Sequence, residues 1–199
     1  MPQNKMNREP EPLNWQQSVL MYLHDLIYLL LGLLVVFLLV FRLIVVSGDS
    51  MYDTLVDGDY LLLLSNTFYR EPEHGDIVVI SKQSYDNGAP IVKRVIASEG
   101  QTVDIDFIQG IVYVDGAALD EAYIYSPTTV YEGVDFPVTV EDGCYFVLGD
   151  NRGVSKDSRS PEIGMVDQRE ILGQALFLLL PGTNHGYSPM EFDRIGVIK

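Results

Sequence analysis

The stretch LIYLLLGLLVVFLLVF, residues 26–41, carries no charged side chain and is followed by Arg42 and four more apolar residues. A helix of about 20 apolar residues is long enough to cross the hydrocarbon core of a bilayer. If the Arg42 side chain reaches toward the lipid head groups, the whole of 21–46 can span. The sequence therefore predicts a short N-terminal segment (1–20), a transmembrane anchor (21–46) and one main domain (47–199).

The same stretch could instead be the apolar part of a cleaved secretory signal. Val45 and Ser47 are small enough for the −3 and −1 positions of a cleavage site, and Gly48 would then become the new terminus. Such a cut would detach the residues that follow from their support, so we favour a retained anchor.

Basic residues are distributed unevenly around the apolar stretch. Lys5 and Arg8 precede it, whereas no Lys or Arg occurs between Leu43 and Tyr69. Because Lys and Arg concentrate on the cytoplasmic side of membrane proteins, this bias places the N-terminus in the cytoplasm. We therefore expect a single-pass protein of the cell membrane whose main domain is extracytoplasmic.

Short apolar runs separated by turn signals fill the main domain. Gly-Asp dipeptides open two of them, residues 60–64 and 77–80, and the hairpin dipeptide Asp115-Gly116 closes a third. Residues 175–180 are also apolar, but this run is too short to cross a bilayer. No convincing amphipathic helix is present in this region. The predicted fold class is mainly β: one N-terminal transmembrane helix followed by a mostly antiparallel β-sheet domain.

Charge and composition limit the partners and ligands of this chain. The formal net charge is −15, so we expect no nucleic-acid partner. Cys144 is the only cysteine and the three histidines are scattered, so the sequence predicts neither an internal disulfide nor a metal site. Nothing in the sequence calls for a cofactor, and nothing in it specifies an oligomeric state.

Two polar residues stand where chemistry can be expected. Ser50 lies in SGDSMYDT, residues 47–54, directly after the apolar stretch, and Lys93 lies in the apolar segment PIVKRVI, residues 90–96. Burial among apolar neighbours can lower the pKa of a lysine from about 10.4 toward neutrality, so that it can take the proton of a serine hydroxyl. The alternative is a lysine that extends into solvent from the edge of a strand, as most lysines do.

A third segment, GDNRGVSKDSR at residues 149–159, is too rich in polar side chains for an ordinary turn. With this segment included, the chain resembles the type I signal peptidases, a family of Ser/Lys endopeptidases that remove signal peptides from exported proteins. The resemblance is carried, in family order, by Ser50-Met51, by Gly75-Asp76-Ile77-Val78-Val79, by Lys93-Arg94-Val95-Ile96 and by residues 149–159.

The resemblance implies a role for each matching residue. Ser50 would be the nucleophile and its N–H an oxyanion donor, Lys93 the general base, and Ser155 the hydroxyl that orients the lysine. Asp157 and Arg159 would form a structural ion pair beneath the site, and Met51 and Val92 would line pockets for small side chains. The implied partners are the signal peptides of preproteins emerging from the export machinery, together with membrane lipid.

The match has departures, and other functions stay open. Gly48 stands where some members carry a serine that supplies a second oxyanion donor, and Asp53 replaces the usual proline, a rigid turn element. One alternative is a related Ser/Lys protease of the self-cleaving repressor type, but those proteins are soluble and carry DNA-binding or partner segments. The other is a non-enzymatic, membrane-anchored β-domain that binds a partner at the surface.

Overall fold

The computed structural model describes residues 14–187 and 189–198, and the chain divides into two compact units, Met1–Leu39 and Val40–Lys199. Helix α1, Trp15–Val40, is predominantly apolar and has none of its residues buried. By length and composition alone it could cross a membrane, and an 18-residue window within it has a mean hydropathy of 2.5.

The helix does not coincide with the predicted anchor of residues 21–46. It begins earlier, at Trp15, and it ends at Val40. Residues Phe41–Val45 instead form strand β1, whose main chain pairs along its full length with β2, Tyr60–Ser65. The apolar run therefore changes from helix to strand where a leucine-rich partner strand can satisfy its backbone groups. Hydropathy alone cannot locate that change, so the predicted C-terminal end was too late.

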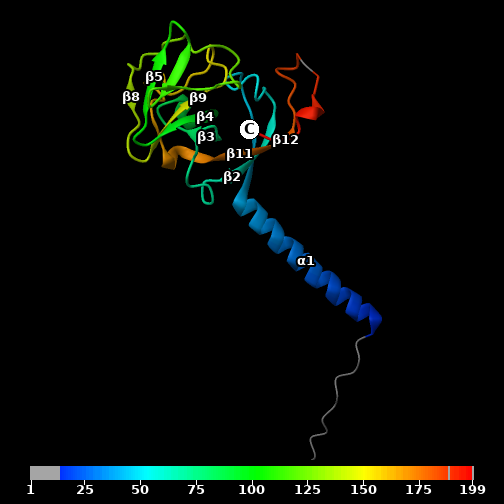
Figure 1. Ribbon diagram of the computed structural model, residues 1–199. Helices are drawn as coiled ribbons and strands as arrows, with labels where there is room; N and C mark the ends of the chain where they lie inside the picture. Colours follow the sequence, from blue (N-terminus) through cyan, green and yellow to red (C-terminus); the bar gives the residue numbers. More distant parts are fainter. Residues whose placement is uncertain (1–13, 188, 199) are drawn as a thin grey trace, which may run out of the picture. The chain divides into compact units, whose positions relative to one another are not determined.

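The main sheet has eight strands, and every pair of neighbours in it is antiparallel. Its order is β1-β2-β11-β3-β4-β9-β10, and β12 pairs with β11. Beyond β1 and β2, its strands are β3 (Ile77–Ser81), β4 (Pro90–Ser98), β9 (Cys144–Leu148), β10 (Val166–Asp167), β11 (Ile171–Leu180) and β12 (Gly196–Val197). Figure 1 shows β3, β4 and β9 side by side.

A second, four-stranded sheet has the order β7-β6-β5-β8. Its strands are β5 (Thr102–Asp106), β6 (Ile111–Val114), β7 (Ala117–Ala118) and β8 (Val138–Thr139). The predicted hairpin dipeptide joins β6 to β7, where Asp115 and Gly116 have φ of +51° and +80°. Three short 3₁₀ helices complete the unit: η1 (Asp86–Gly88), η2 (Gln168–Glu170) and η3 (Phe192–Arg194).

Two strand edges of the main sheet stay open, and they position the site. Among the described residues, 90–93 of β4 pair only with β3, because the pairing with β9 begins at Arg94. Strand β1 is the terminal strand of this sheet, and within the same part of the chain it pairs only with β2. The predicted fold class, a mainly antiparallel β-domain after one N-terminal apolar helix, is confirmed.

Candidate active site

Ser50 and Lys93, the residues predicted to form the catalytic pair, lie side by side. Lys93 belongs to β4, where its register partner in β3 is Val78. Its Nζ atom donates hydrogen bonds to the Ser50 Oγ atom at 2.9 Å and to the Val92 carbonyl oxygen at 2.9 Å. A group about 3 Å from the hydroxyl that it must deprotonate meets the reach required of a general base.

The surroundings of Lys93 favour its uncharged form. Only 2% of the residue is exposed, and burial lowers the pKa of Lys93 to about 8. The carboxylates of Asp157 and Asp150 act in the opposite sense on this pKa, but desolvation is the larger effect. A substantial fraction of this lysine is therefore neutral, and able to accept a proton, at mildly alkaline pH.

The turn that carries Ser50, residues 48–52 (the Ser50 turn), is held by the polar segment 149–159. Asn151 donates its main-chain N–H to the Ser50 carbonyl oxygen at 3.0 Å and its side-chain amide to the Asp49 carbonyl oxygen at 3.1 Å. Within the part of the chain that the structure describes, the Ser50 N–H donates no hydrogen bond. It is therefore available to a negatively charged oxygen beside the hydroxyl.

A pocket of about 270 Å³ opens beside the Ser50 hydroxyl. Its walls are residues 44–47 from the end of β1 and residues 90–92 from the start of β4, and all of these except Ser47 are apolar. Val92 lines this pocket, whereas Met51 does not. Met51 is 1% exposed and packs in the hydrophobic core, where it supports the wall residues Val46 and Val92.

The predicted ion pair between Asp157 and Arg159 is present and fully buried. The Arg159 guanidinium donates to both carboxylate oxygens, at 2.8 and 2.9 Å, and both side chains are 0% exposed. Asp157 also accepts the Gly149 N–H at 3.0 Å, while Arg159 donates to the main-chain carbonyls of Arg152 and Ser155. The pair therefore ties together the two ends of the polar segment.

A second buried ion pair was missed by the sequence reasoning. Arg94, the residue after Lys93, donates to both carboxylate oxygens of Asp150 at 2.9 and 2.7 Å, and the Thr54 hydroxyl donates to the same carboxylate at 2.5 Å. The Arg94 guanidinium also lies 4.1 Å from the centre of the Tyr123 ring. Asp150 thus links the Lys93 strand to the chain that follows Ser50. The only signal in the sequence was the unusual density of polar residues at 149–159.

The predicted hydrogen bond between Ser155 and Lys93 is not formed in this structure. The Ser155 hydroxyl is 0% exposed and has no hydrogen-bond partner in the described part of the chain. It lies close to the Ser50 turn, because a Cβ atom added to Gly149 would collide with both the Ser155 hydroxyl and the Ser50 carbonyl oxygen. A buried hydroxyl without a partner can accept a hydrogen bond from a donor that moves within reach.

We expect Ser155→Ala to lower activity without lowering stability. The substitution removes an unpaired buried hydroxyl, so the folded state loses no hydrogen bond that it now makes. A hydrogen bond to the charged lysine formed during the reaction would be lost, and such a bond contributes about 1.5–3 kcal/mol, or roughly 10- to 100-fold in rate. Steady-state kinetics and thermal unfolding of the same preparation test this. A Tm several degrees lower, with a wild-type rate, would assign Ser155 to folding alone.

Comparison with known proteins identifies the family. The model for the family described as "Signal peptidase, peptidase S26" matches residues 19–180. "Probable signal peptidase I-1" of Synechocystis sp. is 37% identical, over 91% of this chain and 92% of that protein. "Signal peptidase I" of Bacillus licheniformis is 32% identical, over 87% of this chain and 95% of that protein.

A solved signal peptidase I from Enterococcus faecalis V583 is 34% identical and covers 52% of this chain and 96% of that chain, with a TM-score of 0.43. Because that score is low, the assignment rests on the family model and the sequence relatives, which cover most of the chain. The chain therefore belongs to the signal peptidase family, peptidase S26, and is a serine endopeptidase.

Proposed function

We propose that this protein is a membrane-anchored endopeptidase that removes N-terminal signal peptides from exported preproteins with a Ser50–Lys93 dyad. One observation carries the proposal: a lysine that is 2% exposed places its Nζ atom 2.9 Å from a serine hydroxyl, next to an apolar pocket. The named signal peptidases that it resembles over most of its length support the substrate class.

The proposed reaction proceeds through an acyl-enzyme. Neutral Lys93 takes the Ser50 proton while Oγ attacks the scissile carbonyl, and the Ser50 N–H donates to the resulting oxyanion. The lysine ammonium then returns the proton to the leaving amine as the C–N bond breaks. Water then attacks the ester, with Lys93 again as the base. The carboxylate product leaves and the Ser50 hydroxyl is restored.

The signal peptide would bind in extended form between the open edges of β1 and β4. The main chain of Val46 makes hydrogen bonds with Asp59 and Gly58, on the side of β2. Because main-chain groups alternate along a strand, those of Val45 and Ser47 face the open side. An added peptide strand can pair with such an edge. The small size of the pocket and its apolar walls favour small side chains, as expected at positions −1 and −3 of the cleaved signal.

The anchor in this proposal is helix α1, with the N-terminus in the cytoplasm and the peptidase domain outside. Its length and hydropathy support the anchor, and Lys5 and Arg8 at the N-terminal side support the orientation. Confining the enzyme and its membrane-bound substrate to one membrane raises their effective concentration without any added contact.

The proposed function is tested with the full chain in detergent and a preprotein substrate. We expect the wild type to cut after the signal peptide and Ser50→Ala to lose activity by about 10⁴-fold or more, because the nucleophile is gone. Ser84→Ala is the matched control, since Ser84 is exposed, does not line this pocket and donates its hydroxyl to the Glu162 carbonyl oxygen. Cleavage by Ser50→Ala at the wild-type rate would reject the dyad and favour a non-enzymatic or differently catalysed function.

We expect the protein to stay in the membrane fraction after washing in alkaline carbonate, because α1 is long enough and apolar enough to span. Added protease should digest the peptidase domain from outside in intact cells. Mass spectrometry of the mature protein checks the alternative of a cleaved signal. A mature N-terminus at Gly48 would refute the anchor.

A further inference from the structure

The C-terminal segment beyond residue 180 lies outside the part of the chain that the family model matches, yet it packs closely on the Ser50 region. Gly182 donates its N–H to the Asp59 carboxylate at 2.7 Å, and Asn184 donates its N–H to the Asp57 carbonyl oxygen at 3.2 Å. A Cβ atom on Gly182 would collide with the Asp57 carbonyl oxygen, so the two backbones meet at a distance that only glycine allows. Residues 182–187 form a turn, the C-terminal turn.

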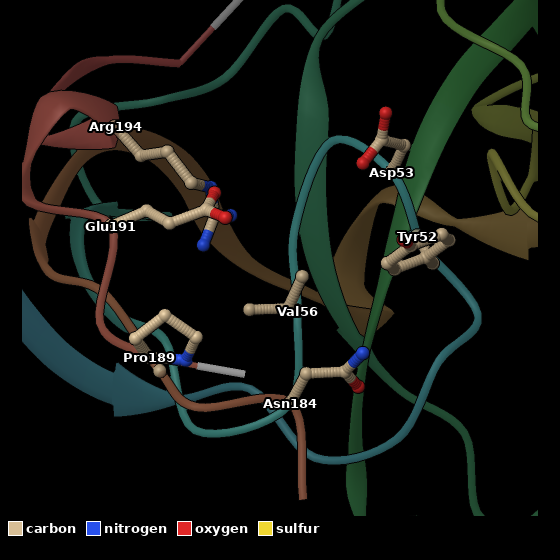
Figure 2. Close-up of a pocket in the computed structure, with 8 residues that line it drawn as sticks. Tyr52, Asp53, Val56, Asn184, Pro189, Glu191 and Arg194 are labelled. Atoms are coloured by element: carbon tan, nitrogen blue, oxygen red, sulfur yellow. The ribbon is translucent and has the colours of Figure 1, made fainter. Parts of the chain in front are cut away.

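A pocket of about 310 Å³ separates the rest of this segment from the chain after Ser50. In Figure 2, Tyr52, Asp53 and Val56 come from the chain that follows Ser50, and Asn184 and Arg194 come from the C-terminal segment. Arg194 also lines this pocket, and its guanidinium donates to both Asp59 carboxylate oxygens, at 3.0 and 2.7 Å. Gly182 and Arg194, both from the C-terminal segment, are therefore attached to the same carboxylate, that of Asp59.

His185, in the C-terminal turn, bridges two carboxylates that belong to the Ser50 region. Its Nε2 atom lies 3.0 Å from Oδ1 of Asp49, the residue before Ser50, and its Nδ1 atom lies 3.4 Å from Oδ2 of Asp57. The other oxygen of Asp57 accepts the Gly48 N–H at 2.9 Å. His185 therefore contacts Asp49, which lies within the Ser50 turn, and Asp57, which binds the N–H of the first residue of that turn.

The backbone at this histidine adopts a conformation that few side chains favour. Asn184 and His185 have φ of +46° and +57°, in the left-handed region where Asn and His are over-represented among non-glycine residues. The turn is closed by main-chain bonds from Gly186 to Thr183 and from Tyr187 to Asn184, each 3.0 Å long. This conformation directs the imidazole toward the two carboxylates.

We propose that His185 is a positioning residue for the nucleophile: by holding Asp49 and Asp57 it fixes the Ser50 turn in the geometry that lets Lys93 reach the hydroxyl. This inference rests on the proposed function, but the contact itself does not. The imidazole is 44% exposed and the pairs are half-exposed, so they contribute little to folding. A small displacement of a reacting group, in contrast, costs much in rate.

The test compares His185→Ala with His185→Gln in the full chain in detergent. Both variants place a non-glycine side chain at the same positive φ, so they share the backbone cost, but the glutamine amide still donates to one carboxylate. We expect kcat for a preprotein substrate to fall about fivefold in His185→Ala and less in His185→Gln, with KM unchanged. His74→Ala is the control, because His74 bonds the Ile96 carbonyl oxygen instead, and its kcat should not change.

Two further measurements decide between positioning and a general structural effect. In a double-mutant cycle, His185→Ala should cost nothing more once Asp49 and Asp57 are both changed to alanine, because the imidazole then has nothing to hold. Hydrogen exchange followed by mass spectrometry should be faster for the peptide 46–55 in His185→Ala, and unchanged elsewhere. The second readout does not depend on activity.

The outcomes are distinguishable. An unchanged kcat in His185→Ala, an equal loss in the Asp49→Ala/Asp57→Ala background, or an unchanged exchange rate at 46–55 would each overturn the positioning role. Faster exchange at 46–55 in a protein whose wild type does not cut preproteins would leave the contact intact and reject the proposed function instead.

Discussion

We expect Lys93→Met to lose activity and gain stability at the same time. Methionine has a similar length and no proton-accepting nitrogen, so the Ser50 hydroxyl would lose the proposed base and kcat/KM should fall by about 10²–10⁴-fold or more. Lys93→Arg should be as inactive, because a guanidinium is effectively never deprotonated. Kinetics with a preprotein substrate measure both variants.

The gain in stability follows from the lowered pKa of Lys93, about 8 in the folded protein. An unfolded lysine titrates near 10.4, so below pH 8 both states bind the proton and the folded state carries the full cost of burying the ammonium. Lowering the lysine pKa to about 8 on folding corresponds to roughly 3 kcal/mol of unfolding free energy. Lys93→Met should therefore raise the Tm at pH 7 by several degrees.

The pH dependence of this gain has a defined sign. Between pH 8 and about 10.4 the unfolded wild type binds more protons than the folded wild type, so its stability rises with pH and the advantage of Lys93→Met shrinks. Because only neutral Lys93 can act as the base, wild-type kcat/KM should rise with pH as Lys93 of the free enzyme loses its proton, with a pKa of about 8.

Lys82→Met is the control for both effects. Lys82 binds the Glu170 carboxylate at 3.0 Å and lies partly exposed, so its loss should leave activity unchanged and should not stabilise the fold. A Lys93→Met variant that is active, or one that melts below the wild type at pH 7, would contradict the assignment of Lys93 as a buried base.

The predictable part of this structure is the part that depends on local pattern. Alternating or continuous apolar runs predicted the strands around Leu61, Val78 and Lys93, and the Asp115-Gly116 dipeptide predicted its hairpin. Both kinds of prediction succeed because turn conformation and strand burial depend on residues that are close together in the sequence. The Ser50 and Lys93 pair could be predicted only with the family resemblance. An isolated lysine in an apolar strand does not reveal which serine it meets.

The parts that could not be predicted depend on contacts between distant segments. The apolar run 26–46 gives no signal for the change from helix to strand after Val40, because that change depends on the pairing with β2. The Arg94–Asp150 pair joins residues 56 positions apart, and the His185 contact with Asp49 joins residues 136 positions apart. Met51 was expected to line a pocket for small side chains, but it packs in the hydrophobic core beside Val46 and Val92, which line the pocket next to Ser50.

The largest expected loss of stability comes from the ion pair beneath the site. Arg159→Met leaves the Asp157 carboxylate buried without its counter-charge, and it removes the donors to the carbonyl oxygens of Val130, Arg152 and Ser155. Breaking a buried pair in this way costs about 3–5 kcal/mol. For a chain of this size that corresponds to a Tm lower by roughly 10 °C.

The chain offers a matched control at the same spacing. Asp167 and Arg169 form the same Asp-x-Arg pair, but the Arg169 side chain is 89% exposed. Because exposed pairs contribute about 0–1 kcal/mol, Arg169→Met should leave the Tm nearly unchanged. Thermal unfolding of the full chain in detergent compares the two variants directly. Equal Tm shifts for Arg159→Met and Arg169→Met would show that the buried pair does not hold the polar segment in place, and the Ser50 turn would then need another support.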